Sequence, residues 1–485
     1  MNENIFTTVC PGCSMACGMY VREKDDGTID IDWRKDAVVN AGKLCRFGVR
    51  LPHNLKPATS KVDGAEADLS DAVAAAGDAI GDGAVFVSVG NTTCEEHLAL
   101  MKLAESKGAV VNTGMGAFSM VPSECHPTMG VGIPFDAIES AKKIVLFIDP
   151  YEQYPLLVRR ILASKKNGAT VTAVGCKAIS LADENKAIGP DSYEAELALD
   201  SDSVIIADLN PSSDPEQVMV LLNLAKASGA PIIFMKPFVN AVGCDLASRK
   251  TAQKSLDQII TEIDSGEIKT LVCMDSDLIE IMPDETAVRE ALEKLDNLVV
   301  ITSRDSATTD VANIVVATEP FYKKAGTVVN AEGRAIAGSG AGTDGIDAIG
   351  SMIGQPVDLF SEVNAAVLAT LGVDAVDERV IPEYEKPEYA AMDVSPTAEA
   401  VETALVYAYN PFLWNGIVDD NDFVEMNLDM VTSNSLLKGI PVRIASDRGE
   451  VAVRFKVSDV APGVVLSNVK LPMTTGMVTS VTLSR

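Results

Sequence analysis

Three cysteines stand within eight residues near the start of the chain, and a fourth follows much later. Two residues separate Cys10 from Cys13, three separate Cys13 from Cys17, and Cys45 follows after twenty-seven more, in "GKLCRFG". Residues 1–55 are otherwise polar and nearly empty of long apolar runs, so a hydrophobic core alone is not expected to hold them. We therefore expect the four thiolates to converge on a metal centre that organises the segment.

Four thiolate ligands suit either structural zinc or an iron–sulfur cluster. Structural zinc usually pairs two CxxC knuckles, whereas this chain places three cysteines in one loop and leaves the fourth alone. The pattern therefore favours a 4Fe-4S cluster. Zinc, and thiols that are merely reactive or incidental, are the alternatives.

Composition limits where the protein works and what it binds. Nine cysteines in 485 residues, with no charged-then-apolar signal stretch before Cys10, favour a reducing, cytoplasmic compartment over a secreted disulfide framework. No run of about eighteen apolar residues is present, so we expect a soluble protein without a transmembrane segment. The formal net charge of −29 argues against a general nucleic-acid or anionic-lipid surface.

Beyond the linker "HNLKPATSKVDG", apolar strands alternate with helical segments. Residues 84–90 ("AVFVSVG") predict a buried strand, and the following helix is expected to have Thr92 or Thr93 as N-cap, a Glu95 or Glu96 capping box and Gly108 as its end. The strand–helix–strand unit recurs from "KKIVLFIDP", "SVIIADLNP" and "IKTLVCMDSD". We predict an α/β fold whose doubly wound parallel sheets are covered by helices on both faces.

The composition changes again around residues 393–400, after a segment rich in Pro and Glu. The segments "ALVYAYN", "PVRIAS" and "EVAVRFKV" alternate as strands do, and Asp447-Arg448-Gly449 predicts a tight turn between the last two. We predict three parts: a cysteine-rich domain at 1–55, interleaved α/β domains at 56–392 and a small β-barrel-like domain at 401–485.

Ligands of parallel α/β sheets bind at the carboxyl ends of the strands, so residues that end strands are the first candidates for a site. These are Gly90 to Cys94, Asp149 to Glu152, Gly175, Lys236 and Asp275 to Asp277. Taken singly, a strand-end aspartate is more often a helix cap, and a loop glycine is more often a turn.

One histidine, His126, directly follows a cysteine in "SECHPTMG", a loop expected on the ligand side of the sheet. A thiolate beside an imidazole offers a soft metal ligand next to a group that titrates near neutrality. The alternative is an inert buried cysteine beside a solvated histidine. The other cysteines outside the N-terminal group are expected to be structural: Cys94, Cys176, Cys244 and Cys273.

Taken in order, these features resemble the molybdopterin-dependent oxidoreductases. The resemblance rests on the N-terminal cysteine spacing, Cys125-His126, a strand-ending "DP", "KAGTVVNAEGR" at 324–334 and a terminal β domain, and it covers nearly the whole chain. Within the family, the Cys-His pair is similar to the formate dehydrogenase catalytic (alpha) subunits and to the B subunit of formylmethanofuran dehydrogenase. The terminal domain resembles the family's molybdopterin dinucleotide-binding domain.

The resemblance implies cofactors and roles. Cys10, Cys13, Cys17 and Cys45 would hold one 4Fe-4S cluster, and Arg46 would lie between cluster and pterin. Cys125 would ligate molybdenum or tungsten carried by bis-molybdopterin guanine dinucleotide, and His126 would relay a proton or stabilise the transition state. The reaction would interconvert CO2 and formate, with electrons leaving through the cluster to a partner subunit of a larger complex.

The anionic cofactor needs donors inside an acidic chain, and helix N-termini and backbone amides after the strands can supply them. Carboxylates at these positions would bind ribose hydroxyls or guanine rather than phosphate. The predicted cofactor-binding residues besides Arg46 are Gly90, Asn91, Thr92, Asp149, Glu152, Gly189, Asp191, Asp275, Asp277, Gly326 and Asn330.

The chain also departs from the family. Formate dehydrogenases usually carry an arginine in a Pro-x-Arg-Gly type segment near the metal, where this chain offers Lys236 as the candidate catalytic residue without a bidentate fork. "VGCKA" stands where Asp-Pro-Arg is common, and the chain is shorter than a typical catalytic subunit. The leading interpretation is a formate/CO2 enzyme. The alternatives are a relative with another substrate and a relay or scaffold subunit that has lost the metal.

Overall fold

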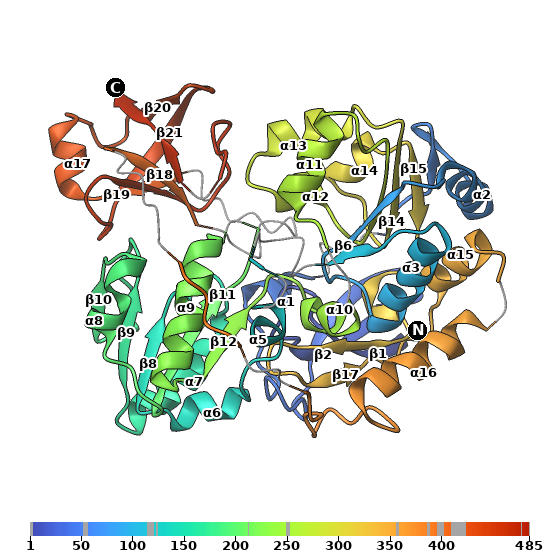
Figure 1. Ribbon diagram of the computed structural model, residues 1–485, viewed down its shortest axis with the longest axis horizontal. Coiled ribbons are helices and arrows are strands. Elements are labelled where there is room, and N and C mark those ends of the chain that lie inside the picture. The colour runs from blue at the N-terminus through green and yellow to red at the C-terminus, as the bar shows by residue number, and fades with distance from the viewer. Residues whose placement is uncertain are drawn as a thin grey trace. The chain divides into compact units, whose positions relative to one another are not determined.

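A computed structural model describes residues 3–51, 57–113, 121–122, 125–211, 213–248, 253–355, 358–385, 389–394, 402–408, 423–476 and 478–484. The chain forms two compact units, each built from segments far apart in sequence (Figure 1). Unit 1 comprises Met1–Pro134, Met235–Leu278 and Arg289–Glu388, and unit 2 comprises Phe135–Phe234, Ile279–Val288 and Tyr389–Arg485. Within the described ranges, no helix has the length and apolarity needed to cross a membrane.

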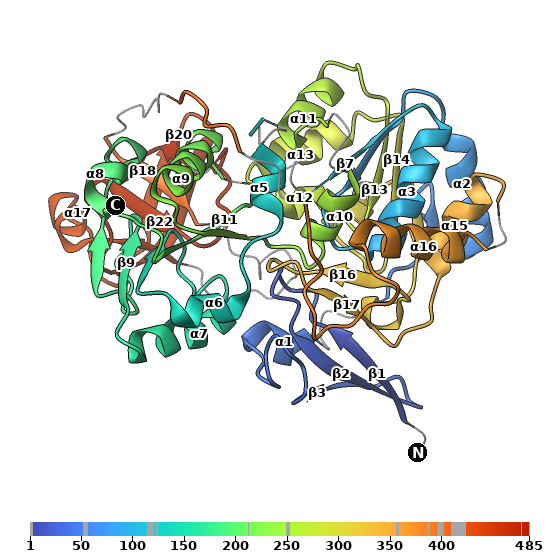
Figure 2. The ribbon, with the colours of Figure 1, turned by 60° about the horizontal axis from the view of Figure 1, so that its bottom comes forward.

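The N-terminal part of unit 1 is a small antiparallel sheet followed by a short helix, α1 (Arg46–Arg50) (Figure 2). Its strands pair in the order β1 (Glu3–Val9), β2 (Gly18–Lys24) and β3 (Ile29–Trp33). Because Val9 pairs with Gly18, the sequence "CPGCSMAC" forms the connection of the β1–β2 hairpin. The first three cysteines are therefore presented together at one end of the sheet.

A seven-stranded sheet forms the core of unit 1. Its order is β5-β4-β15-β14-β13-β6-β7, and the strands from β15 to β7 are parallel. Successive residues of β13 and β14 are buried, as expected for strands covered on both faces. The strands are β4 (Lys61–Val62), β5 (Ala65–Glu66), β6 (Val85–Ser88), β7 (Val111–Thr113), β13 (Thr270–Met274), β14 (Asn297–Thr302) and β15 (Ile314–Ala317).

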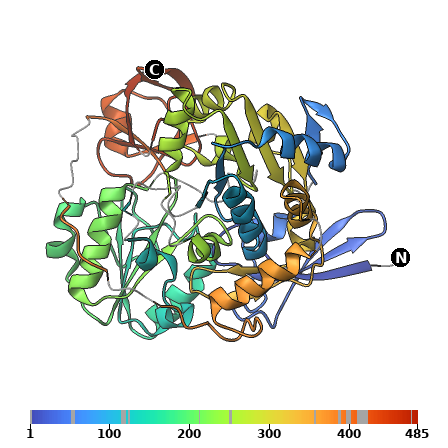
Figure 3. The same ribbon diagram turned by 45° about the vertical axis from the view of Figure 1, so that its right-hand side comes forward.

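Helices pack on both faces of this sheet (Figure 1). On one face α2, α3 and α15 bury a core that includes Phe86, Leu100, Met274 and Ile349, and α16, orange in Figure 3, lies beside α3. Besides α1, the helices that the structure describes in unit 1 are α2 (Leu69–Ala79), α3 (Cys94–Ser106), α5 (His126–Gly130), α10 (Ala241–Ser248), α11 (Leu256–Asp264), α14 (Ala307–Val311), α15 (Asp344–Met352) and α16 (Leu359–Leu371). Two further helices, α12 (Leu278–Ile281) and α13 (Glu285–Leu292), fall where the chain changes unit.

The start of α3 shows how local sequence places the ligand-facing loops. Thr93 is the N-cap: its Oγ1 accepts from Glu96 N (3.1 Å) and its own N–H donates to Glu96 Oε2 (2.9 Å). This reciprocal pair is the capping box expected from the sequence. After β15, the 3-10 helix η4 (Phe321–Lys323) leads to the hairpin of β16 (Thr327–Val329) and β17 (Ala335–Ala337).

Unit 2 contains a five-stranded sheet of order β10-β9-β8-β11-β12, whose pairs from β10 to β11 are parallel. Its strands are β8 (Lys143–Leu146), β9 (Thr170–Val174), β10 (Glu184–Lys186), β11 (Ser203–Asp208) and β12 (Ile232–Met235). The accompanying helices are α6 (Phe135–Ser140), α7 (Pro155–Lys166), η3 (Pro190–Ser192), α8 (Tyr193–Leu197) and α9 (Pro215–Ser228). The predicted alternation of strands and helices is confirmed in both units.

The C-terminal part of unit 2 is a seven-stranded sheet of order β23-β18-β22-β19-β21-β20-β24. Its edge strands β23 and β24 are consecutive in sequence and separated only by Val481, so the sheet curls until its edges nearly meet. The predicted barrel-like domain is confirmed, including the tight turn where Ser446 pairs with Gly449. The elements are β18 (Ala404–Tyr407), β19 (Phe423–Met426), α17 (Leu428–Ser433), β20 (Val442–Ser446), β21 (Gly449–Val457), β22 (Val464–Ser467), β23 (Val478–Ser480) and β24 (Thr482–Ser484).

Candidate functional site

The N-terminal cysteines lie in a loop that is closed on itself. Cys10 N donates to Cys17 O (2.8 Å), and Ala16, with φ of +50°, donates its N–H to Cys13 O (3.1 Å). Cys10 and Cys17 are buried, whereas Cys13 and Cys45 are half-buried. The loop therefore brings three thiols together without support from a large apolar core.

Two contacts bring the fourth cysteine to this loop. The buried Asn40 accepts from Gly18 N (2.9 Å) and donates to Gly18 O (3.0 Å) and Lys43 O (2.8 Å), so it ties the end of the cysteine loop to the approach to Cys45. The ring of Phe47 packs on Gly12, where a Cβ would lie 2.4 Å from the ring. Neither contact was predicted from the sequence, because both join positions far apart in the chain.

The thiol environment suits a multinuclear centre. Burial raises the pKa of Cys10, with added repulsion from Cys45 and Cys13, and burial together with Cys45 raises the pKa of Cys13 to about 12. These thiols therefore stay protonated unless a metal takes them as thiolates. Among the described residues, no three His, Cys, Asp or Glu side chains are close enough to share one metal ion. A 4Fe-4S cluster takes one thiolate per iron, and the four N-terminal cysteines supply that number.

Cys125 and His126 lie at the start of α5. Cys125 is fully buried and is the N-cap of this helix, and its N–H donates to Pro122 O (2.9 Å). His126 Nε2 lies 3.1 Å from Val121 O. Because a carbonyl only accepts hydrogen bonds, Nε2 carries the proton, and Nδ1 of the neutral ring is left as an acceptor.

Lys236 joins the helix that follows Cys125 to the cysteine loop. Its side chain is fully buried, and Nζ donates to Met129 O and Gly130 O, both at 2.7 Å, at the end of α5. Its backbone exchanges hydrogen bonds with Ser14: Lys236 N donates to Ser14 Oγ (2.8 Å), and Ser14 N donates to Lys236 O (2.9 Å). Burial lowers the pKa of Lys236 to about 7, against the opposing influence of Asp245.

The loop after β6 brings the predicted residues Gly90, Asn91 and Thr92 into the interior. Gly90 has φ of +104°, and a Cβ there would lie 2.6 Å from the backbone of Ala241, so only glycine fits at this approach to α10. Thr92 is engaged internally, with its carbonyl accepting from Asn240 Nδ2 (2.9 Å). Asn91 differs because its buried Oδ1 has no partner among the described residues.

The segment 324–334 connects α3 with the cysteine loop. Gly326 has φ of +137°, and a Cβ at this position would lie 2.5 Å from Glu95 Oε2. The N–H of Thr327 donates to the same oxygen (2.7 Å). At the other end, Asn330 Nδ2 donates to Met15 O (3.4 Å) and Ala331 N donates to Ser14 O (2.8 Å). The predicted residues Gly326 and Asn330 thus position protein segments next to the site.

Asn240 is a central residue that the sequence interpretation did not select. Its N–H donates to Gly90 O (2.8 Å), and its Oδ1 accepts from Val329 N (2.7 Å) and from Cys94 Sγ (3.5 Å). It therefore joins the β6 loop, the start of α3 and the hairpin strand β16. The signal was an Asn directly before a helix, in "VNAVGCD", but its partners lie far away in sequence.

Asp275 and Asp277 follow the end of β13, and both form hydrogen bonds within the protein. Asp275, with φ of +42°, accepts at Oδ1 from Ser303 N (2.8 Å) and binds Lys324 Nζ at Oδ2 (2.5 Å). Asp277 accepts at Oδ1 from the side chain (2.7 Å) and N–H (3.2 Å) of Thr308. Their proposed binding of ribose or guanine stays a prediction.

Lys324 lies at the centre of a buried ionic group. Besides Asp275, its Nζ contacts Glu96 Oε1 at 2.7 Å. Burial raises the pKa of the neighbouring Glu319 to about 7, although Lys324 lowers it. Burial acts to lower the pKa of Lys324, but Asp275, Glu96 and Glu319 outweigh it, so the net shift is upward.

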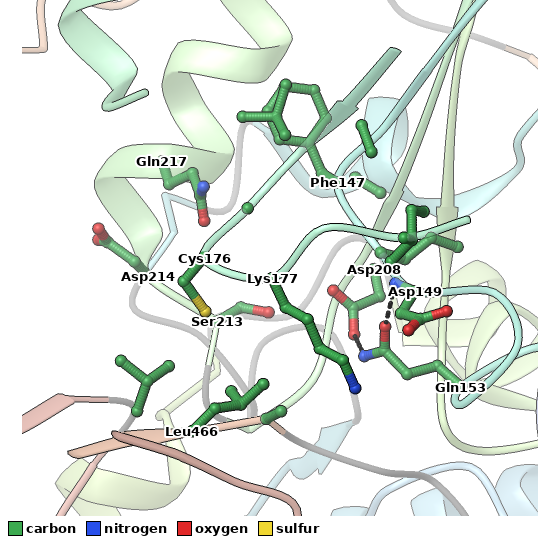
Figure 4. A pocket seen from close by; sticks show the side chains of 18 of the residues that line it. Phe147, Asp149, Gln153, Cys176, Lys177, Asp208, Ser213, Asp214, Gln217 and Leu466 are labelled. Atoms are coloured by element: carbon green, nitrogen blue, oxygen red, sulfur yellow. Dashed lines mark hydrogen bonds between the residues drawn. The ribbon is translucent and has the colours of Figure 1, made fainter. Parts of the chain in front are cut away.

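Unit 2 contains a pocket of 560 Å³ at the carboxyl ends of β8, β9 and β11, closed by residues of β18 and β22 (Figure 4). Of the strand-end residues selected from the sequence, Asp149, Glu152 and Gly175 line it. Gly189 and Asp191 are exposed and do not line it, although their sequence neighbours Ile188 and Pro190 do. The sequence interpretation did not select several further polar lining residues, among them Gln153, Cys176, Lys177, Asp208, Asp214 and Gln217.

The pocket is more anionic than cationic. Four carboxylates line it, those of Asp149, Glu152, Asp208 and Asp214, against the ammonium of Lys177, which pairs with Glu425 at 2.9 Å. Burial raises the pKa of Asp208 to about 6, although the Asn210 and Gln153 amides donate to it. Asp214 also caps α9, so that helix N-terminus already has a negative partner. Such a pocket suits the N–H and O–H donors of a nucleoside better than its phosphates.

Two family profiles match the chain. That of the molybdopterin oxidoreductase Fe4S4 domain matches residues 3–53, and that of molybdopterin oxidoreductase matches residues 71–345, more than half of the chain. The chain belongs to the molybdopterin oxidoreductase family. A 4Fe-4S cluster and a molybdopterin cofactor follow from this membership.

The curated relatives are diverse. The chain is 27% identical over 196 residues to the alpha subunit of the F420-dependent formate dehydrogenase of Methanocaldococcus jannaschii, covering 36% of this chain and 28% of that protein. It is 25% identical over 242 residues to the alpha subunit of the NADPH-Fe(3+) oxidoreductase of Geobacter sulfurreducens, covering 44% and 29%. It is 31% identical over 104 residues to the G subunit of the NADH-quinone oxidoreductase of Yersinia pestis, covering 21% and 11%. The matches span under a third of each relative's length.

A solved structure extends the likeness to the whole fold. Acetylene hydratase from Pelobacter acetylenicus superposes with a TM-score of 0.60 at 11% identity, covering 95% of this chain and 92% of that one. This similarity concerns the fold alone. The two chains therefore share their fold over nearly the whole length of this chain.

The residues of this chain fit the family's cofactors. The four N-terminal thiols offer the soft ligands of a cluster, and the buried Asn91 Oδ1 is an acceptor that awaits a donor. The unit 2 pocket is large enough for a nucleoside, and its carboxylates can accept hydrogen bonds from the nucleoside's N–H and O–H groups. Within unit 1, Lys236 connects the cysteine loop with the α5 segment that carries Cys125 and His126.

Proposed function

We propose that this chain is a molybdenum- or tungsten-dependent subunit that interconverts CO2 and formate and passes electrons through its 4Fe-4S cluster to a partner subunit. The observation that carries the proposal is the buried connection from Cys125-His126 through α5 and Lys236 to Ser14, beside the cluster ligand Cys13. The likeness to the alpha subunit of a formate dehydrogenase supports the choice of substrate.

Each residue has a defined task in this proposal. Cys125 is the thiolate ligand for molybdenum or tungsten, and the bound metal with its pterins supplies the two-electron chemistry. Oxidation of formate to CO2 releases one proton and two electrons. His126 accepts that proton at Nδ1, since Nε2–H is held by Val121 O.

In its protonated form, Lys236 has one donor left for substrate. An ammonium group carries three N–H bonds, and two of them go to Met129 O and Gly130 O. The third can hold a formate oxygen, with less geometric control than an arginine fork gives. The two carbonyl bonds also fix α5, so Lys236 serves both to position the helix and to bind the anion.

The unit 2 pocket would hold the guanosine end of one dinucleotide. Asp149, Glu152 and Asp208 would accept from guanine N–H and ribose O–H groups. In unit 1, Asn91 Oδ1 would accept from a pterin N–H, and Arg46 would stand between cluster and pterin.

Metal analysis with dye assays tests the proposal. Protein purified anaerobically from its native host should contain about four irons and one molybdenum or tungsten per chain, and should reduce a viologen dye with formate. Cys125→Ala should lose molybdenum or tungsten and activity while retaining iron. Cys273→Ala, which removes another buried thiol of unit 1, is the matched control and should keep both. Full formate activity in Cys125→Ala would overturn the ligand assignment.

The likeness to the G subunit of NADH-quinone oxidoreductase favours a second candidate, a relay subunit that keeps the cluster but not the metal. Iron without molybdenum or tungsten in the native protein would select this role. Both metals present without formate activity would instead select a family member with another substrate.

A further inference from the structure

One arginine lies against the end of the cysteine loop. A Cβ at Gly18 would come 3.5 Å from Arg34 Nη1 and 3.6 Å from Arg34 Cδ, so the arginine packs on the residue that directly follows Cys17. Bond lengths and the spacing of neighbouring Cα atoms then put Nη1 within about 9 Å of Cys17 Cα. A positive charge this close to a cluster ligand interacts with any charge that the cluster gains or loses.

A carboxylate from far along the chain neutralises this arginine. Glu378 accepts from both terminal nitrogens of the guanidinium, from Arg34 Nη1 at 2.9 Å and from Nη2 at its other oxygen. The side chains of Arg34 and Glu378 are only 11% and 20% exposed, so most of the solvent is kept away from the pair. A bidentate pair of this kind has a fixed geometry and is among the stronger ion pairs in proteins.

Glu378 belongs to residues 373–385, here called the strap, which follow α16 and form neither helix nor strand. The turn between β16 and β17 holds the strap: Arg334 Nη1 donates to Glu378 O (2.7 Å), and the Tyr384 hydroxyl donates to Gly333 O (2.7 Å). The same turn also bonds to the cysteine loop. The carboxylate of Glu378 is therefore placed by a part of the protein that contacts the cluster ligands' own loop.

The other charges near Arg34 are exposed or already paired. Asp36 Oδ1 lies 3.6 Å from Arg34 Nε, but the Asp36 side chain is 69% exposed. The two aspartates of β3 that precede Arg34 form salt bridges with the arginine and the lysine of β2. Lys35 is exposed, so solvent and salt screen its charge. Glu378 is therefore the carboxylate that acts most strongly on Arg34.

We propose that Glu378 sets the reduction potential of the 4Fe-4S cluster by neutralising Arg34 beside the cysteine loop. The inference rests on the proposed function in one respect, namely that the cluster carries electrons. Reduction adds one electron to the cluster and breaks no bond. An unpaired Arg34 would stabilise the added negative charge, whereas the Glu378 carboxylate cancels this attraction and keeps the reduced cluster a stronger electron donor. Glu378 acts through Arg34 and needs no contact with the cluster.

The test is a redox titration of the anaerobically purified chain, followed by the electron paramagnetic resonance of the reduced cluster. Glu378→Gln removes the carboxylate charge, Arg34→Gln removes the guanidinium charge, and the double variant removes both. Asp377→Asn is the matched control, because this neighbouring carboxylate of the strap is 42% exposed and pairs with Arg379. Iron content is measured first in every variant, and the cations beside Cys45 are unchanged throughout.

Glu378→Gln should favour the reduced cluster at least about threefold, which raises the midpoint potential by about 28 mV at 59 mV per tenfold for one electron. Arg34→Gln should lower the potential by at least the same amount. The double variant and Asp377→Asn should stay within about 1.5-fold of the wild type, or about 10 mV. The two charges oppose each other, so removing both restores the balance that each single variant upsets.

Shifts of the same direction in the two single variants would overturn the proposal, because a merely loosened loop has no reason to respond to the sign of the lost charge. A double variant in which the shifts add, or an unshifted Glu378→Gln, would overturn it as well. Asp36→Asn leaves the strap intact and provides a second measurement on the same guanidinium: it should raise the potential by less than about threefold, and a fall would contradict the proposal. The titration contains no formate, so a negative formate assay refutes only the proposed reaction.

Discussion

The Lys324 group allows a quantitative test of the buried electrostatics of unit 1. The side chains of Lys324, Glu96 and Asp275 are 1%, 3% and 5% exposed, and the ammonium lies 2.7 and 2.5 Å from the two carboxylates. Lys324→Met leaves two buried carboxylates without their cation. Breaking a buried ion pair in this way destabilises a protein by roughly 3–5 kcal/mol, so we expect a loss of about that size at pH 7.

The matched control is a salt bridge of the same length at the surface. Lys102 Nζ lies 2.6 Å from Glu362, but these side chains are 34% and 57% exposed. Exposed pairs contribute about 0–1 kcal/mol, so Lys102→Met should change stability by less than about 1 kcal/mol. Both Glu96 and Lys102 belong to α3, so one set of amides reports on both variants.

Hydrogen exchange followed by mass spectrometry gives the free energy of opening of α3 peptides in each variant. In Lys324→Met the penalty should fall with decreasing pH, because burial raises the pKa values of Glu96 and of the neighbouring Glu319 in the folded state, and protonation then removes unpaired charge. Adding Glu96→Gln should restore part of the loss. A loss below about 1 kcal/mol at pH 7, or one equal to that of Lys102→Met, would refute the reasoning.

Three further changes test the cluster loop and the unit 2 pocket. Asn40→Ala removes the tie between the cysteine loop and the approach to Cys45, so iron per chain should fall by more than about half; retention of four irons would contradict this role. Gly12→Ala should also lower the iron content, because the new methyl group meets the buried Phe47 ring, and the added substitution Phe47→Leu should recover part of it. Asp208→Asn should stabilise unit 2 above pH 6 by up to about 3 kcal/mol, since burial holds the Asp208 pKa near 6 against an ordinary 3.8. Because the folded wild-type protein binds the extra proton, its free energy of unfolding falls as pH rises from about 4 to 6, and the stabilities of wild type and variant should converge near pH 3. A stability gain in Asp208→Asn that does not depend on pH, measured by hydrogen exchange of the β11 amides, would refute this.

Local sequence signals predicted the elements well. The capping box of α3, the apolar parallel strands and the tight turn at Asp447-Arg448-Gly449 all depend on residues a few positions apart. Such short-range preferences act before distant parts of the chain meet. These elements could therefore be predicted without a structure.

The site residues were predicted less completely. Asp149 and Glu152 were found because strand ends are marked by local pattern, and they do line the pocket. Asp208 ends a strand in the same way but was not selected, and its role depends on β18 and β22 closing over it. Asp275 resembles a ligand-binding carboxylate in sequence, yet its oxygens are engaged by Ser303 and Lys324.

The sequence by itself determined which residues can bind a metal centre, where strands and helices begin, and that the chain resembles the molybdopterin oxidoreductases. These follow from side-chain chemistry and short-range backbone preference. Only the tertiary structure decided the partners of Lys236, Asn240 and Asn40, because each of them bonds to segments far away in the chain. Hydrogen bonds and buried charges depend on which groups share a dry interior, and packing alone brings those groups together.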